Sequence, residues 1–138
     1  MEEMAAAAAA AGLDEICFTD HVEPLEWNVT VPKTADYDWP ELERAFARAK
    51  TAAGGRIQLR LGIEMGDAPW DFAWAERQLE RAPELDFVIG SIHSLPPPED
   101  CNLGLFAPAD EAAARASLER YLIQLERMVR WGKFQVVG

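Results

Sequence analysis

The sequence lacks the marks of several protein classes. No apolar run approaches the roughly 20 residues of a transmembrane helix, and the N-terminus has acids where a secretory signal is basic. Bases are scarce, since 13 lysines and arginines stand against 24 acids, a formal net charge of −11. This balance argues against a nucleic-acid or membrane partner. We therefore expect a cytoplasmic chain, and a phosphorylated small molecule stays compatible because bound metal cations reverse the local field.

Cysteine and histidine are also scarce. The two cysteines, Cys17 and Cys101, form no ligand motif. We expect Cys17 to pack as a small apolar residue in a strand and Cys101 to lie in a loop; a disulfide between them is the alternative, which is rare in cytosolic proteins. No G-x-G-x-x-G motif follows the first predicted strand, so a dinucleotide site has no support.

What is present indicates one globular domain. The chain has 138 residues, of which 49% are hydrophobic and 27% charged. Helical and strand-like patterns alternate along it. We predict helices over 2–11, 38–54, 69–81 and 110–131, and strands over 15–19, 57–64, 85–92 and 134–138.

Several helix boundaries carry specific signals. Asp38 can cap the second helix, with Glu41 as its capping-box partner. Gly12 and the Gly54-Gly55 pair provide stops. Asp67, followed by Pro69, is predicted to open the third helix. The last helix has an apolar stripe that we expect to be buried, made of Leu118, Tyr121, Leu122, Leu125 and Met128.

This alternation predicts an α/β fold with parallel strands and right-handed crossovers. An open doubly wound sheet and a barrel both satisfy it. Residues 22–37 and 94–109 are predicted to be long loops.

Three predicted strands end on residues that can bind metal. These residues are His21, Glu64 and His93, and the two histidines are the only ones in the chain. In parallel α/β folds, functional residues collect at the carboxyl ends of the strands, and His and Glu are ligands for zinc, manganese or iron. The alternative is that each histidine is a hydrogen-bonded loop residue and the glutamate is solvated. Spacing alone leaves both interpretations open.

Three segments together carry a family resemblance. "MEEMAAAAAAAGLDEICFTDHVEP", "LRLGIEMG" and "LDFVIGSIHSL", in this order and with these gaps, resemble the PHP (polymerase and histidinol phosphatase) superfamily, and its histidinol-phosphatase branch in particular. The resemblance covers nearly all of the chain, and the two long loops match least.

The resemblance implies a partial (β/α)7 barrel of about four parallel strands, with up to three divalent metals (zinc, manganese or iron) at its C-terminal mouth. His21 would bind one metal, Glu64 would bridge two, and His93 would bind one of that pair. The implied chemistry is hydrolysis of a small-molecule phosphomonoester, L-histidinol phosphate in histidine biosynthesis, by a metal-bound hydroxide.

Three further residues have two interpretations each. Asp20 could orient a metal-binding imidazole from the second shell, or it could cap the turn. Arg60 shares the Glu64 face of its strand, and an ion pair is favoured over a substrate contact. Lys33 lies in the first long loop, where a solvated lysine is favoured over a phosphate contact.

The sequence also departs from the family pattern. Family members open with a strand ending in His-x-His, and they continue beyond a strand like "FQVVG" to another His and an Asp-x-His pair. Residues 1–138 are therefore expected to be a single incomplete PHP domain with little phosphatase activity on its own. The alternatives are a non-catalytic or decayed PHP-like module, or a PHP phosphoesterase with another substrate. The oligomeric state is not predicted.

Overall fold

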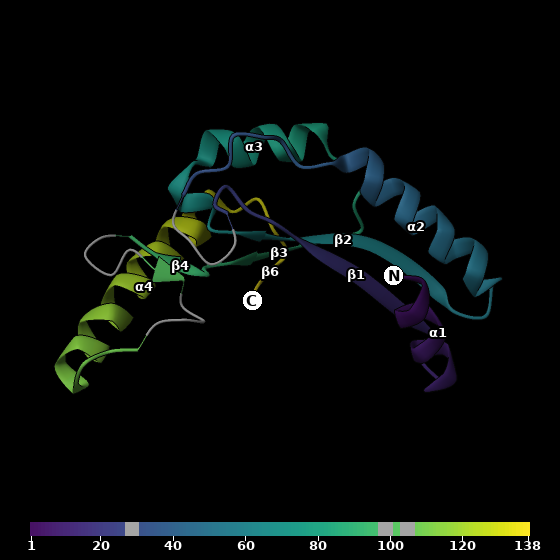
Figure 1. Cartoon of the computed structure of the whole chain (residues 1–138), viewed down its shortest axis with the longest axis horizontal. Helices are drawn as coiled ribbons and strands as arrows, with labels where there is room; N and C mark the ends of the chain where they lie inside the picture. The colour runs from purple at the N-terminus through teal and green to yellow at the C-terminus, as the bar shows by residue number, and fades with distance from the viewer. Residues whose placement is uncertain (27–30, 97–100, 103–106) are drawn as a thin grey trace.

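Helices and strands alternate along the chain (Figure 1). The computed structural model describes residues 1–26, 31–96, 101–102 and 107–138. The helices are α1 (Glu2–Ala10), α2 (Trp39–Ala53), the 3₁₀ turn η1 (Ala68–Trp70), α3 (Phe72–Arg81) and α4 (Glu111–Trp131). The strands are β1 (Glu15–Val22), β2 (Gln58–Gly66), β3 (Phe87–Ser91), β4 (Ser94–Leu95), β5 (Cys101–Asn102) and β6 (Val136–Val137).

Four strands form one sheet in the order β1-β2-β3-β6, and every neighbouring pair is parallel. The α/β fold with four parallel strands is therefore confirmed. β4 and β5 form a separate antiparallel pair inside the predicted second loop.

The first two strands run further than the sequence pattern predicted. β1 continues to Val22 and β2 to Gly66, and their ladder pairs Val22 with Met65. Both Val22 and Met65 are fully buried, so the core continues past the point where polar residues suggested a loop. His21 and Glu64 consequently lie within strands, where backbone pairing fixes their positions.

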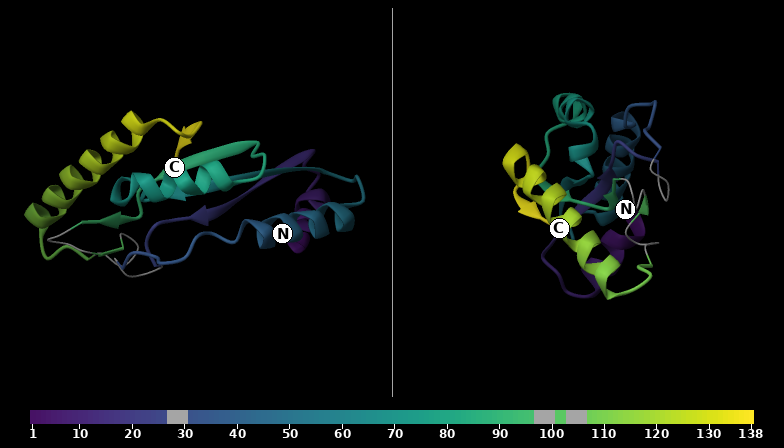
Figure 2. Two further views of the ribbon diagram at one scale, coloured as in Figure 1. Left: turned by 90° about the horizontal axis from the view of Figure 1, so that it is seen from above. Right: turned by 90° about the vertical axis from the view of Figure 1, so that its left-hand side faces the viewer.

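One face of the sheet packs against α2 and α3, which run along the same side of the strands (Figure 1, Figure 2). Phe18, Leu61 and Ile63 point into this core, and Phe18 meets Phe46 of α2 edge to face with ring centroids 6.2 Å apart. Because side chains alternate along a strand, the neighbouring residues face the other side. The two polar strand ends, at His21 and Glu64, share that opposite face.

The predicted cap of α2 is confirmed, because Asp38 Oδ1 accepts a hydrogen bond from the Glu41 backbone N–H at 2.9 Å. The reciprocal half of the capping box is replaced by ion pairs, in which the Glu41 carboxylate binds Arg44 and Arg48. Gly54 ends the helix in the left-handed region, with φ 56°.

The predicted helix over 69–81, opened by Asp67, is divided into the turn η1 and the helix α3. Asp67 precedes only the short turn η1, and its side chain makes no cap there. Asp71 caps α3 instead, through a 2.8 Å bond from the Trp74 N–H to Asp71 Oδ1. The Asp67 carboxylate is therefore available for another contact.

The predicted buried stripe of α4 is only partly buried. Met128 is fully buried, whereas Leu118 and Leu122 are 56% and 51% exposed. The face that α4 buries instead carries Ser117, Gln124 and Met128. The reason is positional: α4 packs beside β3, β4 and η1, and of its apolar stripe Tyr121 and Leu125 are half-buried against the core. Among the described helices, none is long and apolar enough to cross a membrane.

Candidate metal centre

The centre begins with two residues on adjacent strands. His21 of β1 and Glu64 of β2 are direct partners in the parallel register. Their side chains lie on the same face, and His21 Nε2 is 3.5 Å from Glu64 Oε2. The strands thus bring together two of the residues that the sequence singled out.

His93 joins them from the third strand. It lies two residues beyond the end of β3, and its Nε2 is 2.9 Å from Glu64 Oε1. The His21 and His93 rings lie with their centroids 4.9 Å apart. All three predicted ligands therefore meet at the carboxyl end of the sheet.

Glu23 completes the cluster, although the sequence analysis did not select it. It is only 4% exposed. Its Oε1 is 2.7 Å from His21 Nδ1 and 2.8 Å from His93 Nδ1. The signal that could have found it is the strand period of two, which puts residues 21 and 23 on one face.

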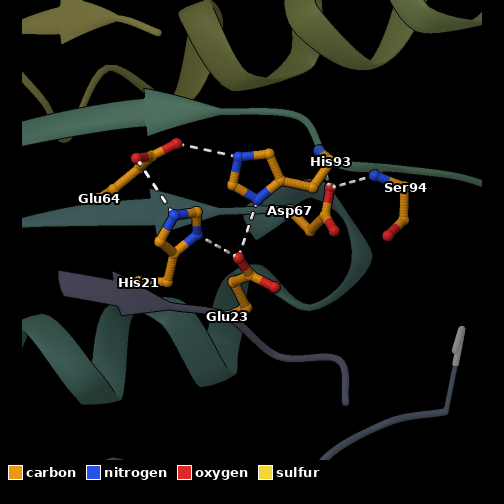
Figure 3. Close-up of polar contacts among 6 residues, drawn as sticks. All are labelled: His21, Glu23, Glu64, Asp67, His93 and Ser94. Carbon is orange, nitrogen blue, oxygen red and sulfur yellow. Dashed lines mark hydrogen bonds and ion pairs between the residues drawn. The ribbon is translucent and has the colours of Figure 1, made fainter. Parts of the chain in front are cut away.

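Together these four residues form a closed cycle, which we call the His–Glu ring: His21, Glu23, His93 and Glu64 (Figure 3). Each imidazole lies between two carboxylates, and each carboxylate lies between two imidazoles. One ligand atom each from His21, Glu23 and His93 lies within 4.8 Å of the others. Imidazole nitrogen and carboxylate oxygen are donors for zinc, manganese or iron, so these residues fit a divalent metal.

Electrostatics couple the members of the ring. The hydrogen bond with Glu23 raises the pKa of His93 to about 9, against the lowering effect of burial, and the charges of Glu23 and Asp67 add to the rise. Burial raises the pKa of Glu23, but hydrogen bonds with His93 and His21 outweigh it and hold that pKa below its usual value. At neutral pH the ring without metal therefore favours a protonated His93 beside an ionised Glu23.

Gly66 leaves room for this arrangement. A Cβ at residue 66 would lie 2.7 Å from Glu23 Cγ and 2.8 Å from His93 Nδ1. Such distances are too short for non-bonded heavy atoms. Glycine at the end of β2 is therefore required by the close approach of Glu23 and His93 from both sides.

Asp67 contacts the ring through the backbone. Its Oδ1 accepts hydrogen bonds from the N–H groups of His93 and Ser94, at 2.8 and 3.0 Å (Figure 3). Burial raises the pKa of Asp67, despite these bonds. The sequence analysis assigned Asp67 to the start of a helix and so missed this contact.

The other residues considered from sequence lie outside the ring. Asp20 is next to His21 in β1, so its side chain projects from the opposite face, where it is hydrogen-bonded to Tyr37. Burial and then the Asp20 charge raise the pKa of Tyr37 to about 12. The second-shell role of Asp20 stays a prediction that this contact does not support.

Arg60 is ion-paired with Glu15 and Asp86, both at 3.1 Å, in agreement with the favoured interpretation. Lys33 is half-buried, and its backbone N–H donates to Pro24 O at 2.7 Å. Its solvated side chain stays a prediction. Cys17 has a free, half-buried thiol, and the Cys101 side chain lies outside the described residues.

Comparisons with known proteins agree with this geometry. A probable histidinol-phosphatase from Deinococcus radiodurans is 29% identical over 136 residues, covering 99% of this chain and 52% of that protein. The crystal structure of histidinol phosphate phosphatase from Lactococcus lactis, complexed with zinc, L-histidinol and phosphate, matches with a TM-score of 0.68 and 22% identity. That match covers 100% of this chain and 51% of the other.

The chain thus spans about half the length of these relatives. The likeness to the solved structure supports the fold. The PHP domain, as a family, matches residues 1–138. The chain belongs to the PHP-domain family.

Proposed function

We propose that this chain carries part of the metal centre of a phosphomonoester hydrolase, and that the substrate of the whole enzyme is L-histidinol phosphate. The observation that supports the metal centre is the His–Glu ring. Its donors come from strands β1 and β2 and from the segments that follow β1 and β3, and their distances of 2.7–3.5 Å bring them close enough to share a cation. A bound divalent metal would supply Lewis acidity toward phosphate oxygens and would activate water.

The ring residues have distinct roles in this proposal. His21 and His93 would bind metal as neutral imidazoles, so each must present a ring nitrogen without a proton. Glu64 contacts both rings and would be the bridging ligand if two metals bind. Glu23 is 4% exposed and contacts both rings from the other side, so it would either bind metal directly or hold the imidazoles in orientation.

Access for a substrate is provided on the His21 side. The His21 side chain is 47% exposed, compared with 21% for His93 and 20% for Glu64. A phosphate would therefore approach from the solvent side of His21. Its negative charge would meet bound cations, which makes the acidic composition of the chain compatible with an anionic substrate.

The substrate is supported by relatives only. The relative from Deinococcus radiodurans bears the name probable histidinol-phosphatase, and the Lactococcus lactis enzyme was crystallised with L-histidinol and phosphate. No contact in the His–Glu ring discriminates histidinol from another alcohol. Another phosphomonoester is therefore the alternative substrate within the same chemistry.

The test is metal content and hydrolysis measured on this chain and on a chain extended in both directions from the coding DNA. L-histidinol phosphate and p-nitrophenyl phosphate are the substrates. We expect the extended chain to bind zinc or manganese and to hydrolyse L-histidinol phosphate faster than p-nitrophenyl phosphate. Glu64→Gln and His93→Asn should each lower kcat/KM at least about 100-fold, whereas Arg60→Gln, on the same sheet face but ion-paired elsewhere, should retain it.

A second candidate is a non-catalytic PHP module. It is favoured by one observation: both nitrogens of each imidazole already face a carboxylate oxygen, so the ring is complete without metal. In that case the extended chain would fold and retain the ring but hydrolyse neither substrate with zinc, manganese or iron added. Hydrolysis of p-nitrophenyl phosphate but not of L-histidinol phosphate would instead support a phosphatase and exclude L-histidinol phosphate as its substrate.

A further inference from the structure

Asp67 has three unusual properties at once. Its exposed fraction is 0%. It is the one non-glycine residue with positive φ in the described part of the chain, at 52°. Its Oδ2 is buried without a hydrogen-bond partner among the described atoms. Residues held in such conformations persist where the surrounding structure requires them, and they cluster at functional sites.

Apart from its backbone O, which accepts from the Trp70 N–H at 2.9 Å, the hydrogen bonds of Asp67 go to the turn that carries His93. Its backbone N–H donates to Ser91 O at 2.9 Å. Its Oδ1 accepts from the N–H groups of His93 at 2.8 Å and Ser94 at 3.0 Å. Asp67 therefore fixes the backbone on both sides of the His93 Cα (Figure 3).

This backbone constraint matters because His93 must satisfy two partners at once. Its two ring nitrogens lie 2.8 Å from Glu23 and 2.9 Å from Glu64, and these carboxylates come from different segments. A shift of the turn by about one ångström directly away from either carboxylate would lengthen that contact beyond hydrogen-bond range. The position of the ring therefore depends on the position of the turn.

We propose that Asp67 is a positioning residue, which sets the His93 imidazole in the metal centre by binding the backbone N–H groups of residues 93 and 94. The expected effect on metal binding rests on the proposed function. The positioning of His93 by Asp67 does not depend on that function. Asp67 acts through His93 and does not itself touch the other ring members in this proposal.

Two substitutions separate the carboxylate from the backbone conformation. Asp67→Gly keeps the positive φ without strain and removes the acceptor. Asp67→Asn keeps an acceptor oxygen, and asparagine tolerates positive φ well. Asp71→Gly is the matched control, since Asp71 also binds a backbone N–H through its carboxylate, at 2.8 Å from Trp74 N, but it caps α3 and makes no contact with the ring.

The experiment uses the whole 138-residue chain. Zinc affinity is measured by competition with a chromophoric chelator. Without metal, NMR gives the amide exchange of residues 93 and 94 and the nuclear Overhauser contacts between the His21 and His93 rings. We expect Asp67→Gly to weaken zinc binding about 10- to 100-fold, to speed both exchange rates and to abolish the ring contacts. Asp67→Asn should restore most of the zinc affinity, the slow amide exchange and the ring contacts. Asp71→Gly should lower stability, while its zinc affinity stays within about threefold of that of the parent chain.

Equal zinc affinities for Asp67→Gly and Asp71→Gly, each in folded protein, would overturn the proposal. Unchanged exchange rates and ring contacts in Asp67→Gly would do so as well. If the parent chain binds no zinc, the proposed metal centre fails. The NMR comparison then still decides the positioning role, because it supports that role only if the ring contacts are lost with glycine and kept with asparagine.

Discussion

The stability of the metal-free chain should fall as the pH rises from about 6.5 to 9. The perturbed group is His93, whose pKa goes from 6.5 in the unfolded chain to about 9 in the folded one, mainly through its hydrogen bond with Glu23. Because the folded state holds the proton more tightly, its contribution is fully present below pH 6.5 and is lost as the pH passes about 9. A rise of this size corresponds to roughly 3 kcal/mol, a large share of the 5–15 kcal/mol typical of a domain.

The assay is urea unfolding at a series of pH values with a chelator present. Cys17 and Tyr37 stay out of this window, because burial raises the pKa of Cys17 from 9.0 and that of Tyr37 to about 12, so both titrate later. His21 and His93 both contact Glu23. The slope of the free energy of unfolding against pH therefore reports on the two histidines as a coupled pair. His93→Asn keeps an N–H donor near Glu23 and is the control in which the slope should largely disappear.

A flat profile, or stability that increases between pH 6.5 and 9, would refute this reasoning. It would mean that the His93 imidazole does not sit between two carboxylates in the absence of metal. An equal slope in His93→Asn would assign the effect to another group.

Three further predictions follow from the same structure. With zinc in excess the pH dependence of stability should reverse, because His93 must lose its proton to bind metal. Titration calorimetry in buffers of different ionisation enthalpy should show about one proton released per zinc at pH 7, and fewer above pH 9. Gly66→Ala should weaken zinc binding at least about tenfold in the same chelator assay, because its Cβ would displace Glu23. Met128→Ala should lower the free energy of unfolding by about 2–4 kcal/mol, whereas Leu122→Ala should change it by less than about 0.5 kcal/mol.

The fold was predictable because its signals are local and repeat along the chain. Alternation in residues 57–64 placed Leu61 and Ile63 on the buried face, and the Asp38 cap marked the start of α2. The apolar stripe of α4 predicted the buried side of this helix only in part, for a physical reason. Periodicity shows which side of a helix is apolar, but which side is buried depends on neighbours, and α4 buries the side of Ser117, Gln124 and Met128.

The candidate site was predictable only in part. His21, Glu64 and His93 could be singled out because each follows or ends an apolar strand and parallel strands bring such positions together. Glu23 was missed because an acid followed by proline reads as loop, yet its carboxylate is 5% exposed and contacts both imidazoles. Asp67 was missed because an aspartate before Pro69 is typical of a helix start, and only tertiary structure shows that it binds the turn 91–94.

The charges of the His–Glu ring are compatible with two states, one without metal and one with the metal that we propose. Two carboxylates carry two negative charges, and the raised pKa of His93 keeps a positive imidazolium between them at neutral pH. A divalent cation that replaced the His93 proton would again leave Glu23, which is 4% exposed, beside a positive charge. A buried charge without a partner is costly, and this exchange avoids it in both states. The ring is thereby suited to exchange protons for metal without repacking the core beneath it, which ends at the fully buried Val22 and Met65.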